Sequence, residues 1–356
     1  NSDNLQADLK PILLIAIKVE VEHSINNVLL PEMDLLYSQL LVRIPYPTAD
    51  LSGQTVVVTG SNTGLGLEAA RHFARLHAAK VILAVRTVSK GDAAKADIQQ
   101  STGCGKDVIE VWELDMSCYA SVKTFAGRLQ TLNRLDILLE NAGVYMDTFE
   151  MAEEDELTIT VNVVNNFLLA LLALPILHAT ATKCRTTPRL SIVASGTYNY
   201  SKLPERESER IFDKLNDKAS ADMQLRYPTS KMLGILIVRQ LAPLMSKSGK
   251  PTVTLNTLAP GLCKSSLTRN VELNRFTALL FIRKMLVARS TEVGSRTLVA
   301  SAVAGEESHG QFMADCQITK VSDFVRSEDG ETTGERVWKE LGEKLEGIQP
   351  GILSNI

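Results

Sequence analysis

Short apolar runs alternate with segments of helical spacing along most of the chain, beginning near residue 53. The apolar runs are rich in β-branched residues, which is typical of strands that are buried on both faces. We predict strands over Thr55–Val58, Lys80–Val85, Val108–Leu114, Leu135–Leu139, Leu190–Ala194 and Thr252–Leu258. We predict helices over Leu67–Leu76, Ala94–Gln99, Ser121–Leu129, Glu156–His178 and about Tyr227–Met245. Strands that alternate with helices indicate βαβ units, and therefore an α/β fold with one doubly wound parallel sheet and helices on both faces.

The alternation continues without a linker from about residue 49 to residue 320, so the sequence predicts one domain over residues 49–356. Residues 1–48 are predicted to form a helical N-terminal extension that ends at Pro45 and Pro47. The most apolar run of this extension, Pro11–Ile17, is too short to span a membrane, and no small-residue cleavage site follows it. We expect the extension to pack on the main domain, with contact to a membrane surface or a partner as the less favoured alternative.

Composition and charge narrow the class of protein without changing this picture. Hydrophobic residues make up 45% of the chain and charged residues 22%, which suits a soluble protein with a large core. The formal net charge of −3 gives no reason to expect nucleic acid or an anionic membrane as a partner. The five cysteines form no CxxC pair, and the five histidines have no metal-ligand spacing. We therefore expect a reducing, cytoplasmic setting, with no disulfide framework and no metal site.

The loop after the first predicted strand contains three glycines and leads directly into a helix. Glycine allows a tight turn and lets the backbone approach a pyrophosphate closely. The following helix presents unpaired N–H groups and a positive dipole end to an anion. The sequence therefore predicts a dinucleotide-phosphate site formed by Gly60, Ser61, Asn62, Thr63, Gly64, Leu65 and Gly66. A strand–helix loop without a ligand is the structural alternative.

Two residues at strand ends bear on the adenosine part of such a cofactor. Arg86 follows the second strand, where a guanidinium can pair with the 2′-phosphate of NADP, whereas an acidic residue there would favour NAD. An ordinary solvated charge is the alternative for Arg86. Asp115 ends the third strand, where it can accept a hydrogen bond from the adenine amino group or cap the next helix.

Tyr227 and Lys231 are four positions apart on a predicted helix, so both side chains can meet one ligand. Reduction of a ketone by hydride leaves an alkoxide that needs a proton, and a nearby ammonium group stabilises the phenolate and lowers the pKa of the phenol. Pro228 lacks an N–H, so we expect it in the first helical turn, with Tyr227 at the start of the helix. In isolation this pair would more often be a surface tyrosine beside a solvated lysine.

Three further segments place polar or small residues where a ligand of this fold would lie. Ser195 follows the strand Leu190–Ala194, so its hydroxyl stands at the carboxyl edge of the sheet, where it can bond a substrate oxygen or merely form a turn. Residues 141–143 (Asn-Ala-Gly) follow the fourth strand and leave room for a cofactor. Asn162 lies in an apolar helix, and a buried amide is either a structural hydrogen-bonding group or part of a proton relay.

Taken together, these segments resemble the short-chain dehydrogenase/reductase family over roughly residues 52–320. The matching motifs, in chain order, are TGSNTGLG, AVR, LDM, LDILLENAG, VNVVNNFLL, Ser195, YPTSK and NTLAPG. The resemblance implies a Rossmann-type fold that binds a nicotinamide cofactor, with Tyr227 as general acid/base and Ser195 orienting the substrate carbonyl. It implies that Lys231 binds the nicotinamide ribose and that Asn162 anchors a relay water. It also implies cofactor contacts from Met116, Asn141, Ala142, Gly143, Pro260, Gly261 and Ser265.

The chain departs from the family pattern at a few places. Glu140 stands where an asparagine is usual, and His77 stands in a turn where glycine is usual. Ser195 precedes Tyr227 by 32 residues, which is more than in many members, so we expect a substrate lid at about residues 196–226, with a second part at 262–290. This longer form resembles the retinol-dehydrogenase-like branch and its fungal relatives. That resemblance implies apolar or aromatic substrates, often in specialised metabolism.

The sequence thus favours an NADP-dependent oxidoreductase acting on a hydrophobic or aromatic ketone or secondary alcohol, with NAD the less favoured cofactor. A non-redox cyclase or an epimerase on the same scaffold is one alternative, and a cofactor-sensing scaffold protein is another. The TGxxxGxG spacing counts against extended epimerases, and the complete set of catalytic side chains counts against a sensor. We expect three aromatic residues to line the substrate pocket: Tyr145, Tyr198 and Tyr200.

The long apolar helix Leu157–His178 bears on the oligomeric state. Because it is apolar on all sides, it lies either in the core alone or in the core and at a subunit face. The resemblance implies that this helix can pair across a two-fold axis in a homodimer. A monomer is the alternative, if the N-terminal extension covers that face.

Overall fold

The computed structural model describes residues 36–265, 267 and 287–356, and the chain divides into two units, residues 1–42 and residues 43–356. The described part of the first unit includes a helix at residues 36–41. Most of the predicted N-terminal extension and of the predicted lid at 262–290 lies outside the described residues. The site and its scaffold belong to the second unit.

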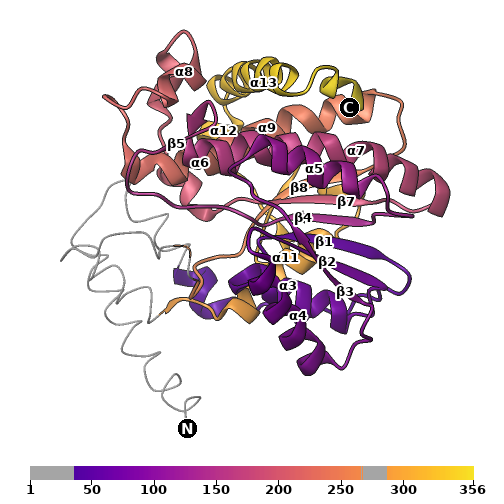
Figure 1. Cartoon of the computed structure of the whole chain (residues 1–356). Helices are drawn as coiled ribbons and strands as arrows, with labels where there is room; N and C mark the ends of the chain where they lie inside the picture. Colours follow the sequence, from indigo (N-terminus) through magenta and orange to yellow (C-terminus); the bar gives the residue numbers. More distant parts are fainter. Residues whose placement is uncertain (1–35, 266, 268–286) are drawn as a thin grey trace, which may run out of the picture. The chain divides into compact units, whose positions relative to one another are not determined.

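An eight-stranded sheet forms the centre of the second unit, in the order β10-β9-β8-β7-β4-β1-β2-β3 (Figure 1). Neighbouring strands run parallel except for β9 and β10, so the predicted parallel sheet is confirmed. The strands are β1 (Thr55–Thr59), β2 (Lys80–Val85), β3 (Ile109–Glu113), β4 (Ile137–Glu140), β7 (Arg189–Val193), β8 (Thr254–Ala259), β9 (Phe312–Ala314) and β10 (Gln317–Ile318). A separate antiparallel hairpin pairs β5 (Met151–Ala152) with β6 (Asp155–Glu156). The strand order reverses beside β1, and ligands of such sheets bind at that point.

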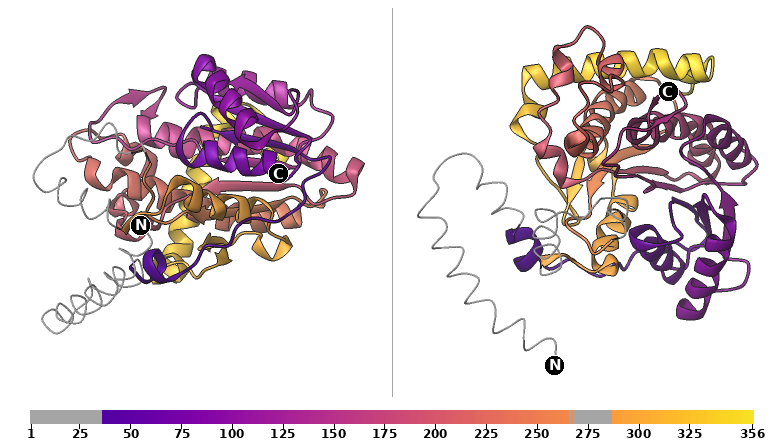
Figure 2. Two further views of the ribbon diagram at one scale, coloured as in Figure 1. Left: turned by 90° about the horizontal axis from the view of Figure 1, so that it is seen from below. Right: turned by 60° about the vertical axis from the view of Figure 1, so that its left-hand side comes forward.

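Helices cover both faces of this sheet, as Figures 1 and 2 show. One face carries α3 (Gly64–Arg75), α4 (Val88–Thr102) and α11 (Thr291–Ala302), and the other carries α5 (Tyr119–Leu129), α7 (Asn165–Cys184) and α9 (Met223–Lys247). The alternation of side chains along a strand divides the core accordingly. In β1, Val57 packs in the core on the α9 side, whereas Val56 and Val58 pack on the α3 side.

The long apolar helix proves to be a core helix with an irregular start. It begins as α6 (Leu157–Ile159), continues through a π-helical turn, η1 (Thr160–Val164), and runs on as α7. Among the described residues, Leu157–Cys184 is the one helical run long and apolar enough to cross a membrane. Because 89% of its most apolar stretch is buried inside the protein, its composition reflects core packing.

The segment between Ser195 and α9 is the predicted insertion. It contains η2 (Gly196–Tyr200), η3 (Pro204–Glu207) and α8 (Ile211–Leu215). The C-terminal helix α13 (Glu328–Ile348) holds it in place, because the Glu340 carboxylate accepts hydrogen bonds of 3.0 Å from the backbone N–H groups of Ile211 and Phe212. The insertion is therefore an integral part of the folded unit.

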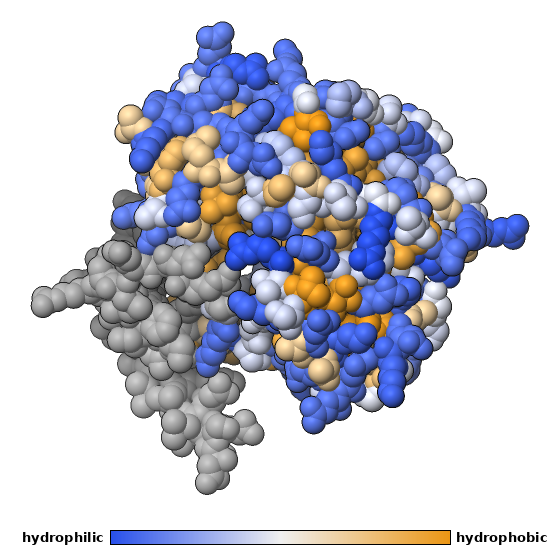
Figure 3. Space-filling model, in the orientation of Figure 1, coloured by the Kyte–Doolittle hydropathy of each residue, from blue (hydrophilic) through white to orange (hydrophobic). Residues whose placement is uncertain are grey.

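The remaining elements are short: η5 (Glu306–Ser308), α12 (Asp323–Arg326) and η6 (Ile352–Asn355). His77, in the turn between α3 and β2, has a φ of 66°, which is the left-handed conformation that glycine favours. On the face seen in Figure 3, hydrophilic residues predominate, and apolar residues form small separate groups. That face therefore has the character of an ordinary solvated surface.

Candidate active site

The glycine-rich loop between β1 and α3 packs tightly against the segment that follows β4. Gly60 and Gly64 have φ values of 64° and 62°, which a side chain would disfavour. A Cβ atom added to Gly60 would lie 3.0 Å from Ala142 Cα, and one added to Gly66 would lie 2.5 Å from Asn141 Nδ2. These glycines are therefore required by the close approach of the two segments.

Thr59 joins the two segments by hydrogen bonds, and this role was not predicted from the sequence. The Thr59 hydroxyl accepts hydrogen bonds of 2.9 Å from the backbone N–H groups of both Asn141 and Ala142. The Asn141 side chain donates to the Thr59 carbonyl at 2.9 Å. The sequence feature that could have indicated this role is a polar residue at the end of an otherwise apolar strand, because a buried hydroxyl needs hydrogen-bond partners.

The N-terminus of α3 has the character of an anion site. Its N-cap residue, Thr63, makes no side-chain capping bond, and the first turn contains no acidic residue. Among the described residues, and apart from its chain neighbours and the backbone of its own helix, nothing lies within 4 Å of a Cβ placed on Gly64. The free N–H groups and the positive helix end are thus available to a phosphate. Ser61 instead turns inward, because its buried hydroxyl donates to the Val58 carbonyl at 2.8 Å.

Arg86 and Asp115 lie at the ends of β2 and β3, as predicted. Arg86 is exposed, and its guanidinium makes no ion pair or hydrogen bond with any residue that the structure describes. Asp115 Oδ1 accepts a 2.9 Å hydrogen bond from Ser117 N, which closes a local turn. The N-cap of α5 is Cys118, so of the two alternatives for Asp115 the capping of this helix is wrong. Met116 is buried, and its carbonyl accepts a 2.8 Å bond from Asn165 Nδ2.

Tyr227, Ser195 and Lys231 meet at the carboxyl edge of the sheet. The Tyr227 ring is buried, and the Ser195 side chain lies close enough to its phenol to lower the phenol's pKa. Lys231 Nζ donates to the Val193 carbonyl at 2.8 Å and lies 5.6 Å from the centre of the Tyr227 ring. The insertion does not separate Ser195 from Tyr227, because it loops away and returns through α9. Ser195 also caps η2 by accepting a 3.3 Å hydrogen bond from Thr197 N, and it accepts a 2.9 Å bond from the Thr197 hydroxyl.

Burial governs the protonation of the two titratable groups. It raises the pKa of Tyr227 to about 12, although the neighbouring Ser195 side chain acts in the opposite direction. It also lowers the pKa of Lys231 to about 8. The prediction that Lys231 lowers the pKa of Tyr227 is therefore wrong for this structure. Both groups have lost solvent, and the ammonium group points to the Val193 carbonyl.

Asn162 lies in the π-helical turn η1 and joins two parts of the site. Its Oδ1 accepts a 2.9 Å bond from Val144 N, and its Nδ2 donates to Val144 O at 2.9 Å and to Ser230 Oγ at 3.0 Å. A Cβ atom on Gly143 would lie 3.1 Å from Asn162 Oδ1 and 3.5 Å from Lys231 Nζ. Asn162 thus has the structural role that was one of its two alternatives. The sequence analysis missed Ser230, although it stands within the YPTSK motif.

Glu140 has an unusual environment for a carboxyl group. It is fully buried, and neither carboxyl oxygen has a hydrogen-bond partner among the described residues. Burial raises the pKa of this carboxyl well above its usual range. The sequence showed that Glu140 departs from the family pattern, but only the structure shows that the departure leaves an unpaired buried acid.

The remaining predicted site residues are the predicted cofactor contacts after β8 and the predicted substrate contacts, which are tyrosines. Pro260, Gly261 and Ser265 follow β8, and Gly261 has a φ of 78°. Tyr145 comes to the reacting centre, with its ring centre 5.1 Å from that of Tyr227.

Tyr198 and Tyr200 do not share the position of Tyr145. Tyr198 is buried, its hydroxyl accepts a 2.8 Å bond from Ser322 N, and its ring packs edge-on against Phe312. Tyr200 is 48% exposed. The prediction that Tyr198 lines the substrate pocket has no support in this packing.

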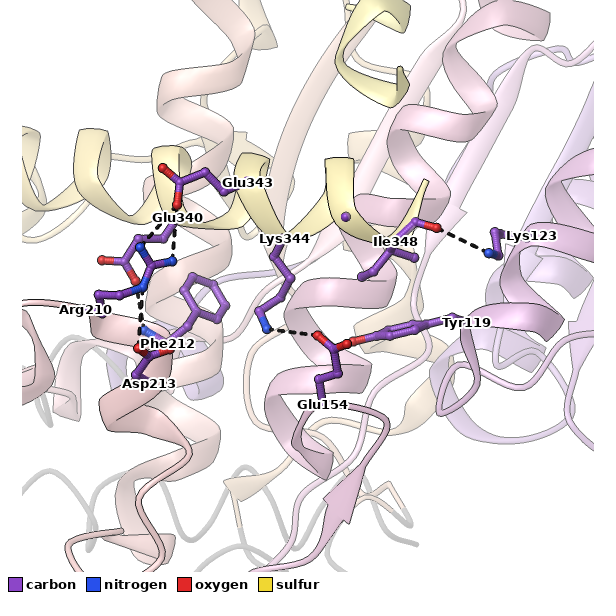
Figure 4. Close-up of a pocket in the computed structure, with 11 residues that line it drawn as sticks. Tyr119, Lys123, Glu154, Arg210, Phe212, Asp213, Glu340, Glu343, Lys344 and Ile348 are labelled. Atoms are coloured by element: carbon purple, nitrogen blue, oxygen red, sulfur yellow. Dashed lines mark hydrogen bonds and ion pairs between the residues drawn. The ribbon is translucent and has the colours of Figure 1, made fainter. Parts of the chain in front are cut away.

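A cavity of about 420 Å³ opens elsewhere, between α5, α8 and α13 (Figure 4). Its charged side chains pair with one another, as Arg210 does with Glu343 at 3.2 Å, and Lys344 pairs with Asp155 at 3.2 Å. None of its lining residues belongs to the constellation around Tyr227. The cavity is therefore separate from the candidate active site.

Comparisons with known proteins agree with this arrangement. Residues 54–184 match the short chain dehydrogenase family. The chain is 47% identical to the short chain dehydrogenase/reductase dmxR8 of Cryptosporiopsis sp., over 91% of this chain and 100% of that protein. It is 43% identical to the short-chain dehydrogenase anuD of Penicillium roqueforti, over 92% and 87% of the two chains. The NADP complex of RhlG from Pseudomonas aeruginosa shares the fold, with a TM-score of 0.57 at 20% identity, over 76% of this chain and 97% of that chain.

Proposed function

Because the chain belongs to the short-chain dehydrogenase/reductase family, we propose that it is an NADP-dependent oxidoreductase of hydrophobic or aromatic ketones and secondary alcohols. The observation that carries the proposal is the contact of Tyr227 with Ser195 and Lys231 at the carboxyl edge of the sheet. The fungal origin of the relatives supports a role in specialised metabolism, and we place the enzyme in the cytoplasm.

The residues around the glycine loop fit a dinucleotide. At Gly60, Gly64 and Gly66 no side chain covers the backbone, so a ligand can approach it closely. The start of α3 has N–H groups without a side-chain cap. Arg86 is exposed and free to pair with a 2′-phosphate, which supports NADP over NAD. We assign Asp115 to the adenine end of the cofactor and Gly143 and Lys231 to the nicotinamide ribose. When bound, the cofactor supplies or accepts the hydride.

Side chains of the protein supply the proton that the reduction requires. In the reducing direction, the phenol of Tyr227 gives its proton to the carbonyl oxygen as the alkoxide forms. A pKa of about 12 keeps this phenol protonated at neutral pH, as a proton donor requires. The Ser195 hydroxyl hydrogen-bonds to the same oxygen and orients it, and we assign Lys231 to the nicotinamide ribose. Asn162, bonded to Val144 and Ser230, holds the segment after β4 at this centre.

The proposed preference for apolar substrates rests on Tyr145. Its ring lies beside that of Tyr227, and it offers an aromatic surface to a substrate whose oxygen lies between Ser195 and the phenol. We place the entrance under the insertion at residues 196–226 and assign Tyr200 to its exposed rim.

Oxidation of NADPH by the pure protein over a panel of aromatic and aliphatic ketones tests this function, with NADH in parallel. Turnover with NADPH should fall by on the order of 100-fold or more in Tyr227→Phe, because general acid catalysis contributes about that much. Tyr198→Phe is the matched control, since it removes the same hydroxyl from a buried tyrosine away from the reacting centre. Equal turnover in Tyr227→Phe and wild type would refute the role of Tyr227. Cofactor binding without reduction of any ketone would favour a non-redox reaction.

A further inference from the structure

A buried ion cluster stands immediately before the reacting tyrosine, and the chemistry described above does not use it. Arg226 is only 1% exposed, and its guanidinium lies 3.6 Å from Glu156 Oε2 and 3.8 Å from Glu205 Oε1. The Glu156 side chain is fully buried, and that of Glu205 is 14% exposed. No guanidinium nitrogen of Arg226 has a hydrogen-bond partner in the part of the chain that the structure describes. The cluster is therefore held by charge attraction.

The three charged residues come from three different elements. Arg226 lies in α9, next to Tyr227. Glu156 is the N-cap of α6, and its other oxygen accepts 2.9 Å hydrogen bonds from the backbone and hydroxyl groups of Thr158. That helix leads directly into the π-helical turn that carries Asn162. Glu205 lies in η3 of the insertion. The guanidinium thus joins the tyrosine helix, the Asn162 helix and the insertion.

A second attachment lies on the other side of Tyr227. The hydroxyls of Ser201 and Thr229 are hydrogen-bonded at 2.8 Å, and both residues are buried. Tyr227 therefore lies between two points, Arg226 and Thr229, at which α9 is fastened to the insertion. A shift of the insertion at either point would turn the start of the helix and move the phenol relative to Ser195.

A buried charge restricts the position of α9 more strongly than an apolar contact would. An uncompensated charge is costly in the protein interior, so α9 can settle only where both carboxylates stay beside the guanidinium. An apolar side chain of similar volume would fill the space without restricting the helix to one orientation. We propose that Arg226 is a positioning residue, which fixes the direction of the Tyr227 side chain by binding Glu156 and Glu205 together. This role rests on the proposed function of Tyr227 as proton donor.

The test compares Arg226→Met and Arg226→Lys with the wild type at three levels. The NADPH affinity, measured by protein fluorescence, should change little. The same titration gives the number of competent sites, which are the sites that bind NADPH. The kcat per competent site for the best ketone of the panel should fall by about tenfold or more in Arg226→Met with little change in KM, since small displacements of a reacting group are costly. Arg226→Lys should recover part of this loss, because it keeps the cation. A merely structural role would lower stability and the number of competent sites, and leave the kcat per site unchanged.

A spectroscopic measurement separates this proposal from the proposed function. In protein labelled with fluorotyrosine, the ¹⁹F resonance of residue 227 is the one that Tyr227→Phe removes. It should broaden or divide in Arg226→Met and stay single in Arg210→Met, which breaks an ion pair on the protein surface. If the wild type reduces no ketone, the proposed function fails and the ¹⁹F spectrum still decides the role of Arg226. Should Arg226→Met not fold, Glu205→Gln removes one attachment and leaves the pair with Glu156. An unchanged kcat per site together with an unchanged resonance would overturn the proposal.

Discussion

Among the individual residues of the site, Lys231 lowers the stability of the folded protein, because its charge is buried. Burial disfavours the cation of Lys231, whose pKa falls from 10.5 to about 8. The single hydrogen bond to the Val193 carbonyl replaces only part of the hydration that an ammonium group has in water. Enzymes accept such costs where a charge must be ready for a ligand.

We therefore expect Lys231→Met to make the folded protein more stable at pH 7, by up to about 3 kcal/mol, while it abolishes turnover. Below about pH 8 the lysine is charged in both the folded and the unfolded states, so the cost of the buried cation is fully present. As the pH rises from about 8 toward 10.5, only the unfolded state stays protonated, and the cost disappears. Urea unfolding of both proteins at pH 7 and pH 10 should show a difference that shrinks with pH. A difference that is constant or grows with pH would contradict this account.

Among the helices, α9 begins at a different residue from the one predicted from the sequence. Pro228 predicted that the helix begins at Tyr227, but α9 begins at Met223, and Asp222 is its N-cap. Asp222 Oδ1 accepts hydrogen bonds of 3.0 and 3.2 Å from Gln224 N and Leu225 N. Such a cap lets the helix form before the proline, which then sits in the interior at the cost of one backbone bond.

Asp222→Ala should accordingly destabilise the protein by about 1 kcal/mol, the usual contribution of an N-cap. Asp222→Asn keeps an accepting oxygen in the same place, so it should unfold close to the wild type. Chemical denaturation of the three proteins measures the difference. Equal losses in both variants would show that the charge of Asp222, rather than its capping bonds, stabilises α9.

Sequence patterns were most informative where one physical requirement dominates. The β-branched runs located the central strands to within a few residues, because a strand buried on both faces must be apolar throughout. The glycines of residues 60–66 and the pair Tyr227 and Lys231 were also recognisable, since their spacing follows from the chemistry. Contacts between distant segments were not predictable. Neither the pairing of Arg226 with Glu156 and Glu205 nor the inward turn of Tyr198 leaves a local signature in the chain.

For the molecule as a whole, the C-terminal segment packs on α9 and on α7, which belongs to the apolar helix predicted either to lie in the core or to form a subunit face. Val337, Leu341 and Leu345 of α13 are completely buried, and α13 packs along α9. The following turn, η6, packs on α7, where Asn355 donates a 3.1 Å hydrogen bond to the Leu171 carbonyl. Part of the outer surface of α7 and α9 is therefore covered by the chain itself, in the way that a second subunit would cover it.

We expect the full chain to be monomeric for this reason. Light scattering coupled to size exclusion should give a mass near 39.0 kDa across the micromolar range, independent of salt. An interface of the usual size needs a continuous open face, and α13 and η6 cover apolar surface of α9 and α7. A stable dimer would contradict this expectation. Substitution of the exposed Leu244 on α9 by aspartate would then show whether the outer surface of that helix contributes, because a charge there should weaken such a dimer and leave a monomer unaffected.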